Sequence, residues 1–150
     1  LFNSSILDNI TMFRNFPEEK TALAVRRAGL ESLLAARGAN TPCGENGSSL
    51  SGGERQRISI ARCLLQSTPV LLADEATASL DSATAFEITS SILSLDGITR
   101  ILVTHRLEEP LLRHFDEILV LKDGRLTEHG SFDSLMENKA YFYSLFTISQ

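Results

Sequence analysis

The chain has no run of apolar residues long enough to cross a bilayer. Its apolar residues come in short runs, none near the roughly 20 consecutive positions that a membrane helix needs. The first residues also lack a basic region followed by an apolar core, so we do not expect a signal peptide. Any membrane role must come from another segment or another chain.

Basic residues and cysteines are also few. Lysine and arginine number 14 against 19 acidic residues, for a formal net charge of -5, whereas nucleic-acid surfaces need clustered positive charge. We therefore expect no nucleic-acid partner. The spacing of Cys43 and Cys63 fits neither a C-x-x-C metal pattern nor a disulfide framework. Reduced thiols in a reducing compartment are the expected state.

A third absence is the phosphate-binding loop G-x-x-x-x-G-K-[ST]. The only lysine followed by a hydroxyl residue is Lys20, before Thr21, and Glu19 rather than glycine precedes it. The chain of 150 residues, 43% hydrophobic and 22% charged, has the size and composition of one soluble globular domain.

The pattern of apolar residues predicts helices first and a parallel α/β arrangement after them. Short helices are expected at 6–10, 17–29 and 30–37, then a loop at 38–49 and a long helix from Ser51 to the break at Thr68-Pro69. The unalternating apolar run 70–73 predicts a strand covered on both faces. A helix at 82–95 and a strand at 100–104 follow, an order typical of a right-handed parallel unit.

The last part of the chain predicts a hairpin and short helices. Strands at 116–121 and 125–128 flank Asp123-Gly124, a pair that favours a tight turn with positive φ angles. A helix capped by Ser131 and another at 140–148 are expected after the hairpin.

Ser51-Gly52-Gly53-Glu54 lies where a loop becomes a helix. The free N–H groups and the dipole of a helix start attract anions, and glycine lets the backbone approach phosphate oxygens closely. The alternative is a capping box, in which Ser51 and Glu54 only stabilise the helix start. Because two adjacent glycines weaken a first turn, the pattern favours a phosphate contact.

Two carboxylates follow the predicted strand 70–73. At the carboxyl end of a parallel strand, Asp74 can hold Mg²⁺ through water, and Glu75 can polarise a nucleophilic water. The alternative is a pair of exposed acids at a strand-to-loop junction. His105 ends the neighbouring strand, where an imidazole can face a γ-phosphate, and this favours the functional interpretation. Asp81 is expected to cap the helix that follows.

The order and spacing of these segments resemble the nucleotide-binding domain of ATP-binding cassette (ABC) transporters. The matching segments are 50–57 for the signature motif, 70–75 for the Walker B strand, 79–81 for the D-loop and His105 for the switch histidine. Glu54 stands where many members have glutamine. Outside these motifs, 1–10 resembles the segment after the Q-loop, 123–130 the C-terminal hairpin, and 41–47 the exporter-type X-loop that touches the membrane domain.

The resemblance implies an α/β fold, a partial P-loop NTPase (RecA-like) parallel-sheet core with an α-helical signature subdomain. The helical subdomain would occupy 1–68, and the C-terminal part of the ATPase core 69–150. The Walker A loop, its strand and the Q-loop glutamine would lie upstream of Leu1. The chain would then need the missing N-terminal half of the same domain and be inactive by itself.

In this family two domains pair head to tail, with each ATP between the Walker A side of one and the signature motif of the other. The resemblance thus implies cofactors ATP and Mg²⁺ and a role for each candidate residue. Glu75 and His105 would be catalytic and act on the domain's own ATP, where Asp74 would bind Mg²⁺. Asp81 would make contact across the interface. The residues that would contact ATP held by the partner domain are Ser51, Gly52, Gly53 and Glu54.

The implied function is ATP hydrolysis that powers exporter-type transport from the cytoplasmic face of the cell membrane. The implied partners are a transmembrane domain and a second nucleotide-binding domain. One alternative is the C-terminal ATPase lobe of a DNA-repair or chromosome-maintenance protein, but residues 1–37 show none of the coiled-coil heptads expected before such a lobe. The other is a non-catalytic partner subunit, against which the presence of both Glu75 and His105 argues.

Overall fold

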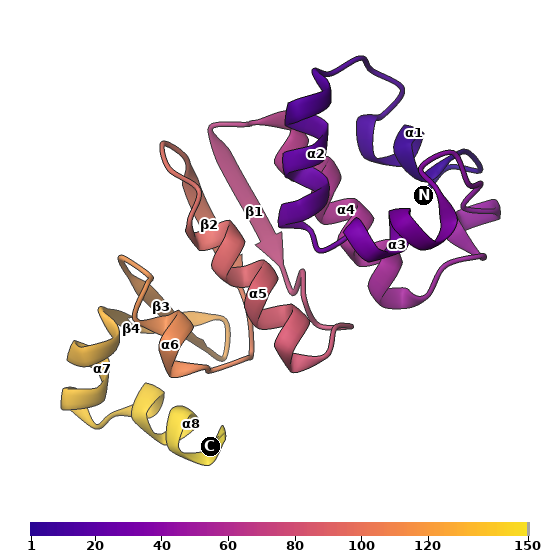
Figure 1. Cartoon of the computed structure of the whole chain (residues 1–150). Coiled ribbons are helices and arrows are strands. Elements are labelled where there is room, and N and C mark those ends of the chain that lie inside the picture. Colours follow the sequence, from indigo (N-terminus) through magenta and orange to yellow (C-terminus); the bar gives the residue numbers. More distant parts are fainter. Residues whose placement is uncertain (150) are drawn as a thin grey trace. The chain divides into compact units, whose positions relative to one another are not determined.

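The computed structural model describes residues 1–149 and divides them into two compact units, one from Leu1 to Val103 and one from Thr104 onward (Figure 1). Each unit has its own cluster of buried apolar side chains. The boundary near residue 68 that the resemblance implies stays a prediction.

The first unit begins with three helices close to the predicted ones: α1 (Ile6–Thr11), α2 (Glu18–Arg27) and α3 (Glu31–Arg37). The Ser5 hydroxyl caps α1 by accepting the Asp8 N–H at 3.0 Å. Gly38, with φ 83°, ends α3, in the positive-φ region that glycine adopts without strain. The following loop contains a short 3₁₀ turn, η1 (Glu45–Gly47).

The long helix α4 (Gly52–Gln66) packs its apolar face into the core of the first unit. Ile58, Ala61 and Leu65 are fully buried, as their spacing predicts. The helix ends at Ser67, whose φ of 50° is left-handed, two residues before Pro69.

The predicted strand–helix–strand unit is confirmed. Strand β1 (Val70–Asp74), helix α5 (Ser82–Leu93) and strand β2 (Thr99–Val103) follow one another, and the two strands pair in parallel. In their register Leu72 lies opposite Ile101, and Asp74 lies opposite Val103. The apolar side of α5 joins the same core as the buried residues of β1.

The described residues cover only one face of β1, which differs from the expectation of cover on both faces. Its residues alternate, with Leu71 and Ala73 buried while Val70 and Leu72 are 51% and 65% exposed. Alternate residues of a strand point to opposite faces, and helices of this unit cover only one of them. Because both faces of the strand carry apolar residues, the sequence shows no alternation.

The second unit holds the predicted hairpin and two helices. Strands β3 (Ile118–Lys122) and β4 (Arg125–Gly130) pair antiparallel through Asp123 and Gly124, which both have positive φ. Helix α7 (Phe132–Asn138), capped by Ser131, and helix α8 (Tyr141–Ser149) follow.

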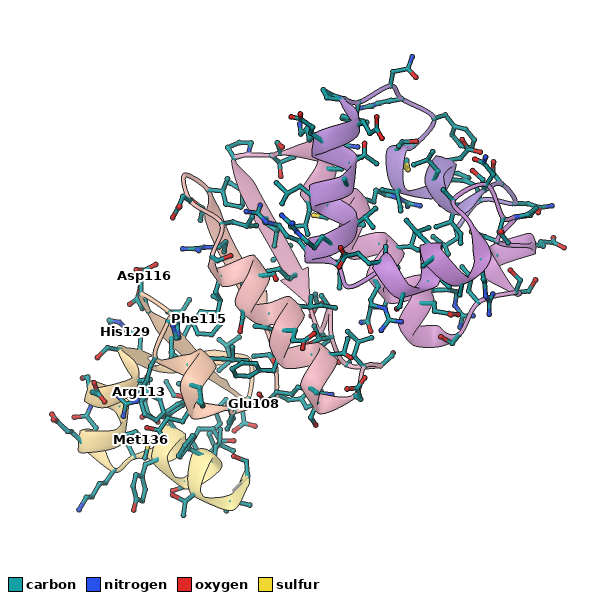
Figure 2. All side chains as sticks on the ribbon, in the orientation of Figure 1. Glu108, Arg113, Phe115, Asp116, His129 and Met136 are labelled. Carbon is teal, nitrogen blue, oxygen red and sulfur yellow. The ribbon has the colours of Figure 1, made fainter. Side chains whose placement is uncertain are left out.

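One short helix of the second unit, α6 (Glu109–Leu112), was not predicted. Arg113 directly follows this helix (Figure 2). Its side-chain nitrogens lie 2.8 Å from Glu109 of α6 and 2.7 Å from Asp133 of α7. These contacts join α6 to α7. A four-residue helix is too short to show apolar periodicity, so its sequence carries little signal.

Candidate active site

The segment Ser51-Gly52-Gly53-Glu54 forms the start of α4, as predicted. The Ser51 hydroxyl accepts the Glu54 N–H at 3.2 Å, and Glu54 Oε2 accepts the Ser51 N–H at 2.6 Å. The capping box that we weighed as an alternative is therefore formed. The hydrogen bond from the Ser51 N–H is the main cause that holds the pKa of Glu54 below its ordinary value.

The capping box leaves the two glycine amides available. Arg55 donates its N–H to the Ser51 carbonyl at 3.0 Å and Glu54 donates to the Ser51 hydroxyl, whereas within residues 1–149 the N–H groups of Gly52 and Gly53 make no hydrogen bond. Gly52 is exposed. These amides and the dipole of the long helix α4 favour an anion at this end. Capping and phosphate binding thus use different donors and are compatible.

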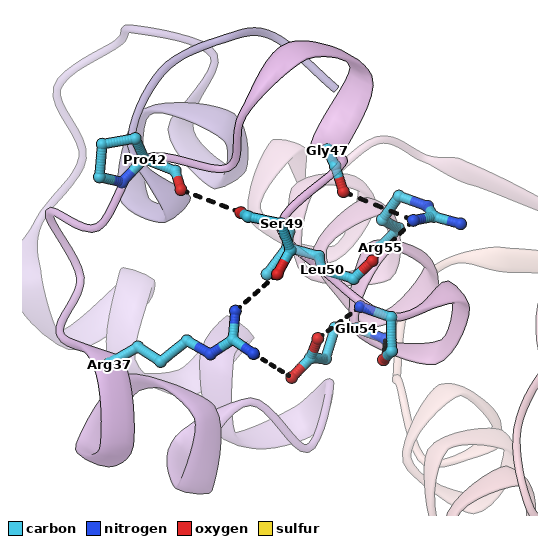
Figure 3. Close-up of polar contacts among 8 residues, drawn as sticks. Arg37, Pro42, Gly47, Ser49, Leu50, Glu54 and Arg55 are labelled. Carbon is cyan, nitrogen blue, oxygen red and sulfur yellow. Dashed lines mark hydrogen bonds and ion pairs between the residues drawn. The ribbon is translucent and has the colours of Figure 1, made fainter.

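Two arginines hold the loop that leads into α4 (Figure 3). Arg37 donates to the Ser49 carbonyl at 2.7 Å, and its other terminal nitrogen lies 3.9 Å from Glu54 Oε1. On the other side, Arg55 donates to the Leu50 carbonyl at 2.7 Å. Charge-assisted bonds of this kind restrain backbone carbonyls strongly. The backbone before the two glycines is therefore held in one position.

Asp74 and Glu75 lie at the carboxyl end of β1, where the sequence places them. Both are exposed, and the Glu75 N–H donates to the Val103 carbonyl of β2 at 2.9 Å. Glu75 has a φ of 45°, a left-handed conformation that is uncommon for a residue other than glycine and occurs often at functional sites. Asp74 also lines an open cavity of about 350 Å³ between α4 and β1.

Gln56 of α4 is a candidate site residue that the sequence did not reveal. Its Nε2 donates to the Glu75 carbonyl at 3.1 Å, and its Oε1 accepts the Ser79 N–H at 3.2 Å. Gly53 lies on the same side of α4 and approaches Leu80 so closely that an added Cβ would stand 3.1 Å from Leu80 Cδ2. The helical spacing of Gly53 and Gln56 is the only signal in the sequence that links them.

The two remaining candidate residues lie in different units. Asp81 caps α5, as predicted, by accepting the Thr84 N–H at 3.0 Å, and this bond holds the pKa of Asp81 below its ordinary value. His105 is exposed and follows Val103 by two positions, at the start of the second unit. Its proximity to Glu75 stays a prediction. Cys43 and Cys63 are both free thiols, as expected.

Comparison with known proteins gives consistent matches. Residues 2–78, just over half of the chain, match the family model described as ABC transporter. A solved structure of a bacterial Atm1-family ABC exporter with ATP bound superimposes with a TM-score of 0.89 and 36% identity, covering 99% of this chain and 26% of that chain. The predicted α/β fold with a parallel sheet is thereby confirmed.

Curated relatives agree with these matches. The mycobactin import ATP-binding/permease protein IrtB of Mycobacterium tuberculosis is 44% identical over 91% of this chain. The beta-(1-->2)glucan export ATP-binding/permease protein NdvA of Bradyrhizobium diazoefficiens is 40% identical over 97%. The ATP-dependent lipid A-core flippase of Neisseria meningitidis is 38% identical over 99%.

The chain spans 24% of the length of each of these curated relatives. Among residues 1–149, no helix combines the length and the apolar content that a membrane span requires. The match to the family model across more than half of the sequence, together with the shared fold, shows that this chain belongs to the ABC transporter family.

Proposed function

We propose that the full-length protein containing this chain hydrolyses ATP to power transport across a membrane, with this chain at the cytoplasmic face. The observation that carries the proposal is the pairing, within one compact unit, of an anion-attracting helix start and a strand that ends in two carboxylates. The names of the relatives, ATP-binding/permease proteins and a flippase, support it. The exporter-type segment 41–47 and the Atm1-family structure favour an exporter architecture.

The start of α4 would contact the triphosphate held by a second nucleotide-binding domain. The amides of Gly52 and Gly53 are the donors, and at Gly52 the absence of a Cβ leaves open space beside the backbone for a phosphate to approach. Ser51 and Glu54 shape this end through the capping box, and Asp81 would reach the same interface. Stabilisation of phosphate charge by fixed donors is the main way in which proteins catalyse phosphoryl transfer.

The carboxyl end of β1 would act on ATP bound by the chain's own domain. Glu75 would orient and polarise the attacking water, and His105 would face the γ-phosphate. Asp74 suits Mg²⁺, because magnesium is usually held by one or two carboxylates together with water and phosphates. When bound, the ion would neutralise phosphate charge.

The chain would work only with partners. The exposed face of the β1–β2 sheet, with Leu72 65% and Ile101 50% exposed, is the kind of apolar surface that another layer covers. We propose that the N-terminal half of the same domain covers it. A transmembrane domain and a second nucleotide-binding domain would complete the proposed transporter. Because the chain has no phosphate loop, ATP turnover by the isolated 150 residues should be undetectable.

The test is Glu75→Gln in the full-length protein, with Glu87→Gln as a matched control, since Glu87 is an exposed carboxylate on α5 of the same unit. Loss of a general base lowers turnover by about 10²–10⁴-fold. We expect that loss for Glu75→Gln, with ATP binding retained, and no change for Glu87→Gln. Equal turnover in the two variants would remove Glu75 from the chemistry and favour a non-catalytic subunit.

A further inference from the structure

We infer that Gln56 is the positioning residue that holds Glu75 and the turn after β1 against the start of α4. The inference rests on the proposed function, because it assigns Gln56 a role in aligning the group that would activate water. Both of these hydrogen bonds of Gln56 go to backbone atoms of the turn.

The two hydrogen bonds of Gln56 hold both ends of one turn. Its Nε2 donates to the Glu75 carbonyl at 3.1 Å, while its Oε1 accepts the Ser79 N–H at 3.2 Å. Inside the turn, the Ala78 N–H donates to the same Glu75 carbonyl at 3.0 Å. A side-chain amide offers a donor and an acceptor on one planar group, and this arrangement uses both.

The backbone of Glu75 is consequently restrained on two sides. Its N–H donates to Val103 of β2 at 2.9 Å, and its carbonyl accepts from Gln56 of α4. Its φ of 45° lies in a sparsely populated region, and such a conformation persists only when the surroundings hold it. The direction in which the Glu75 side chain leaves the backbone therefore depends on α4.

The same contact joins the two parts of the site. The free amides of Gly52 and Gly53 lie at the start of α4, one turn of helix before Gln56. A shift of this helix start when an anion binds would move the turn 75–79 through the Gln56 bonds. Gln56 would then transmit the state of the partner's nucleotide to the group that acts on the chain's own nucleotide.

Helix α4 also contacts the segment after β1 through Gly53 and Leu80. This apolar contact contributes to stability, whereas the Gln56 hydrogen bonds position the turn. Leu80 is 6% exposed and belongs to the core, whereas Gln56 is half-buried, lies outside that core cluster and hydrogen-bonds to the backbone of the turn. Removing the Gln56 amide leaves the apolar packing in place. The variant should therefore keep its nucleotide affinity and lose catalytic alignment.

The experiment measures ATP turnover of the full-length protein with Gln56→Met, which keeps the length of the side chain and removes both hydrogen bonds. Gln66→Met is the matched control, because Gln66 lies on the same helix and accepts one bond from Arg14 at the exposed surface. Turnover is expressed per titrated ATP site, so that loss of folded protein does not alter it. Misplacement of a catalytic group by about 1 Å can cost 10²-fold.

We expect Gln56→Met to lower kcat about tenfold with KM for ATP within about twofold, the pattern of an interaction that acts on the transition state. Gln66→Met should match wild type. Gln56→Glu keeps the acceptor for Ser79 but turns a carboxylate oxygen toward the Glu75 carbonyl, which is a repulsive contact, so kcat should fall at least as far as in Gln56→Met. If Gln56→Met does not fold, the turnover of Gln56→Glu tests the positioning role of Gln56.

Turnover of Gln56→Met or Gln56→Glu equal to that of Gln66→Met would overturn the inference, as would a rise in KM with unchanged kcat. The Glu75→Gln variant separates this failure from that of the proposed function. If Glu75→Gln leaves turnover unchanged, both fail. If Glu75→Gln abolishes turnover and Gln56→Met does not lower it, only the role of Gln56 fails.

Discussion

The two glycines at the start of α4 should respond differently to the same substitution. A Cβ on Gly52 would have only Arg55 Nη2 near it, at 3.9 Å, whereas a Cβ on Gly53 would lie 3.1 Å from Leu80 Cδ2. Leu80 is 6% exposed and belongs to the core of the first unit. Gly52→Ala therefore adds a methyl group to open space, and Gly53→Ala adds one to a filled contact.

The size of the difference follows from two opposing effects. Alanine favours a helix over glycine by up to about 1 kcal/mol, and this gain is common to both variants. Overpacking costs about 1–3 kcal/mol, and the lower end applies because the crowded atom is the terminal methyl of a leucine. Gly53→Ala should therefore be about 1 kcal/mol less stable than Gly52→Ala, which corresponds to about 2–4 °C in Tm for a domain of 150–250 residues.

The assay is thermal unfolding of the complete nucleotide-binding domain that contains this chain, with both variants measured side by side. The double variant Gly53→Ala, Leu80→Val should recover part of the difference, since a smaller residue relieves the crowding. A Gly53→Ala domain that melts at or above Gly52→Ala would refute the packing of α4 against Leu80.

Three further predictions concern capping, pH and a surface ion pair. Ser51→Ala should cost about 1 kcal/mol in urea unfolding, because it removes a helix cap; no change would contradict the capping box. Folding lowers the pKa of Glu54, so its stabilisation is present above the ordinary glutamate pKa of about 4.3 and is lost as pH falls through the folded value. Stability of Glu54→Gln should thus depend less on pH in that acid range, and an unchanged pH profile would contradict the assignment. Arg113→Met should leave the urea midpoint close to that of wild type, because its pairs with Glu109 and Asp133 are exposed, and a clear fall of the midpoint would contradict that view.

Helix ends were predictable because their signals are local. Asp81 and Ser131 cap helices as expected, and Gly38 ends one. Each cap depends on a few neighbouring residues, which a single sequence displays directly. The parallel pairing of β1 and β2 was also predictable, because a helix between two apolar runs leaves little other choice.

Burial of β1 was predicted less well, because it depends on which layers pack against it. Leu72 and Ile101 are as apolar as the buried Leu71, so the sequence cannot distinguish a covered face from an open one. Only the assembled helices show that one face of this pair of strands is left uncovered within the first unit.

The sequence by itself determined the family, the local caps and the positions of the candidate residues along the chain, because these depend on short motifs and their order. Only the tertiary structure decided that Gln56 meets the carbonyl of Glu75 and the amide of Ser79. Those groups are distant along the chain, and their meeting depends on how α4 packs beside the turn after β1. Hydrogen-bond partners of this kind follow from packing, which no local pattern encodes.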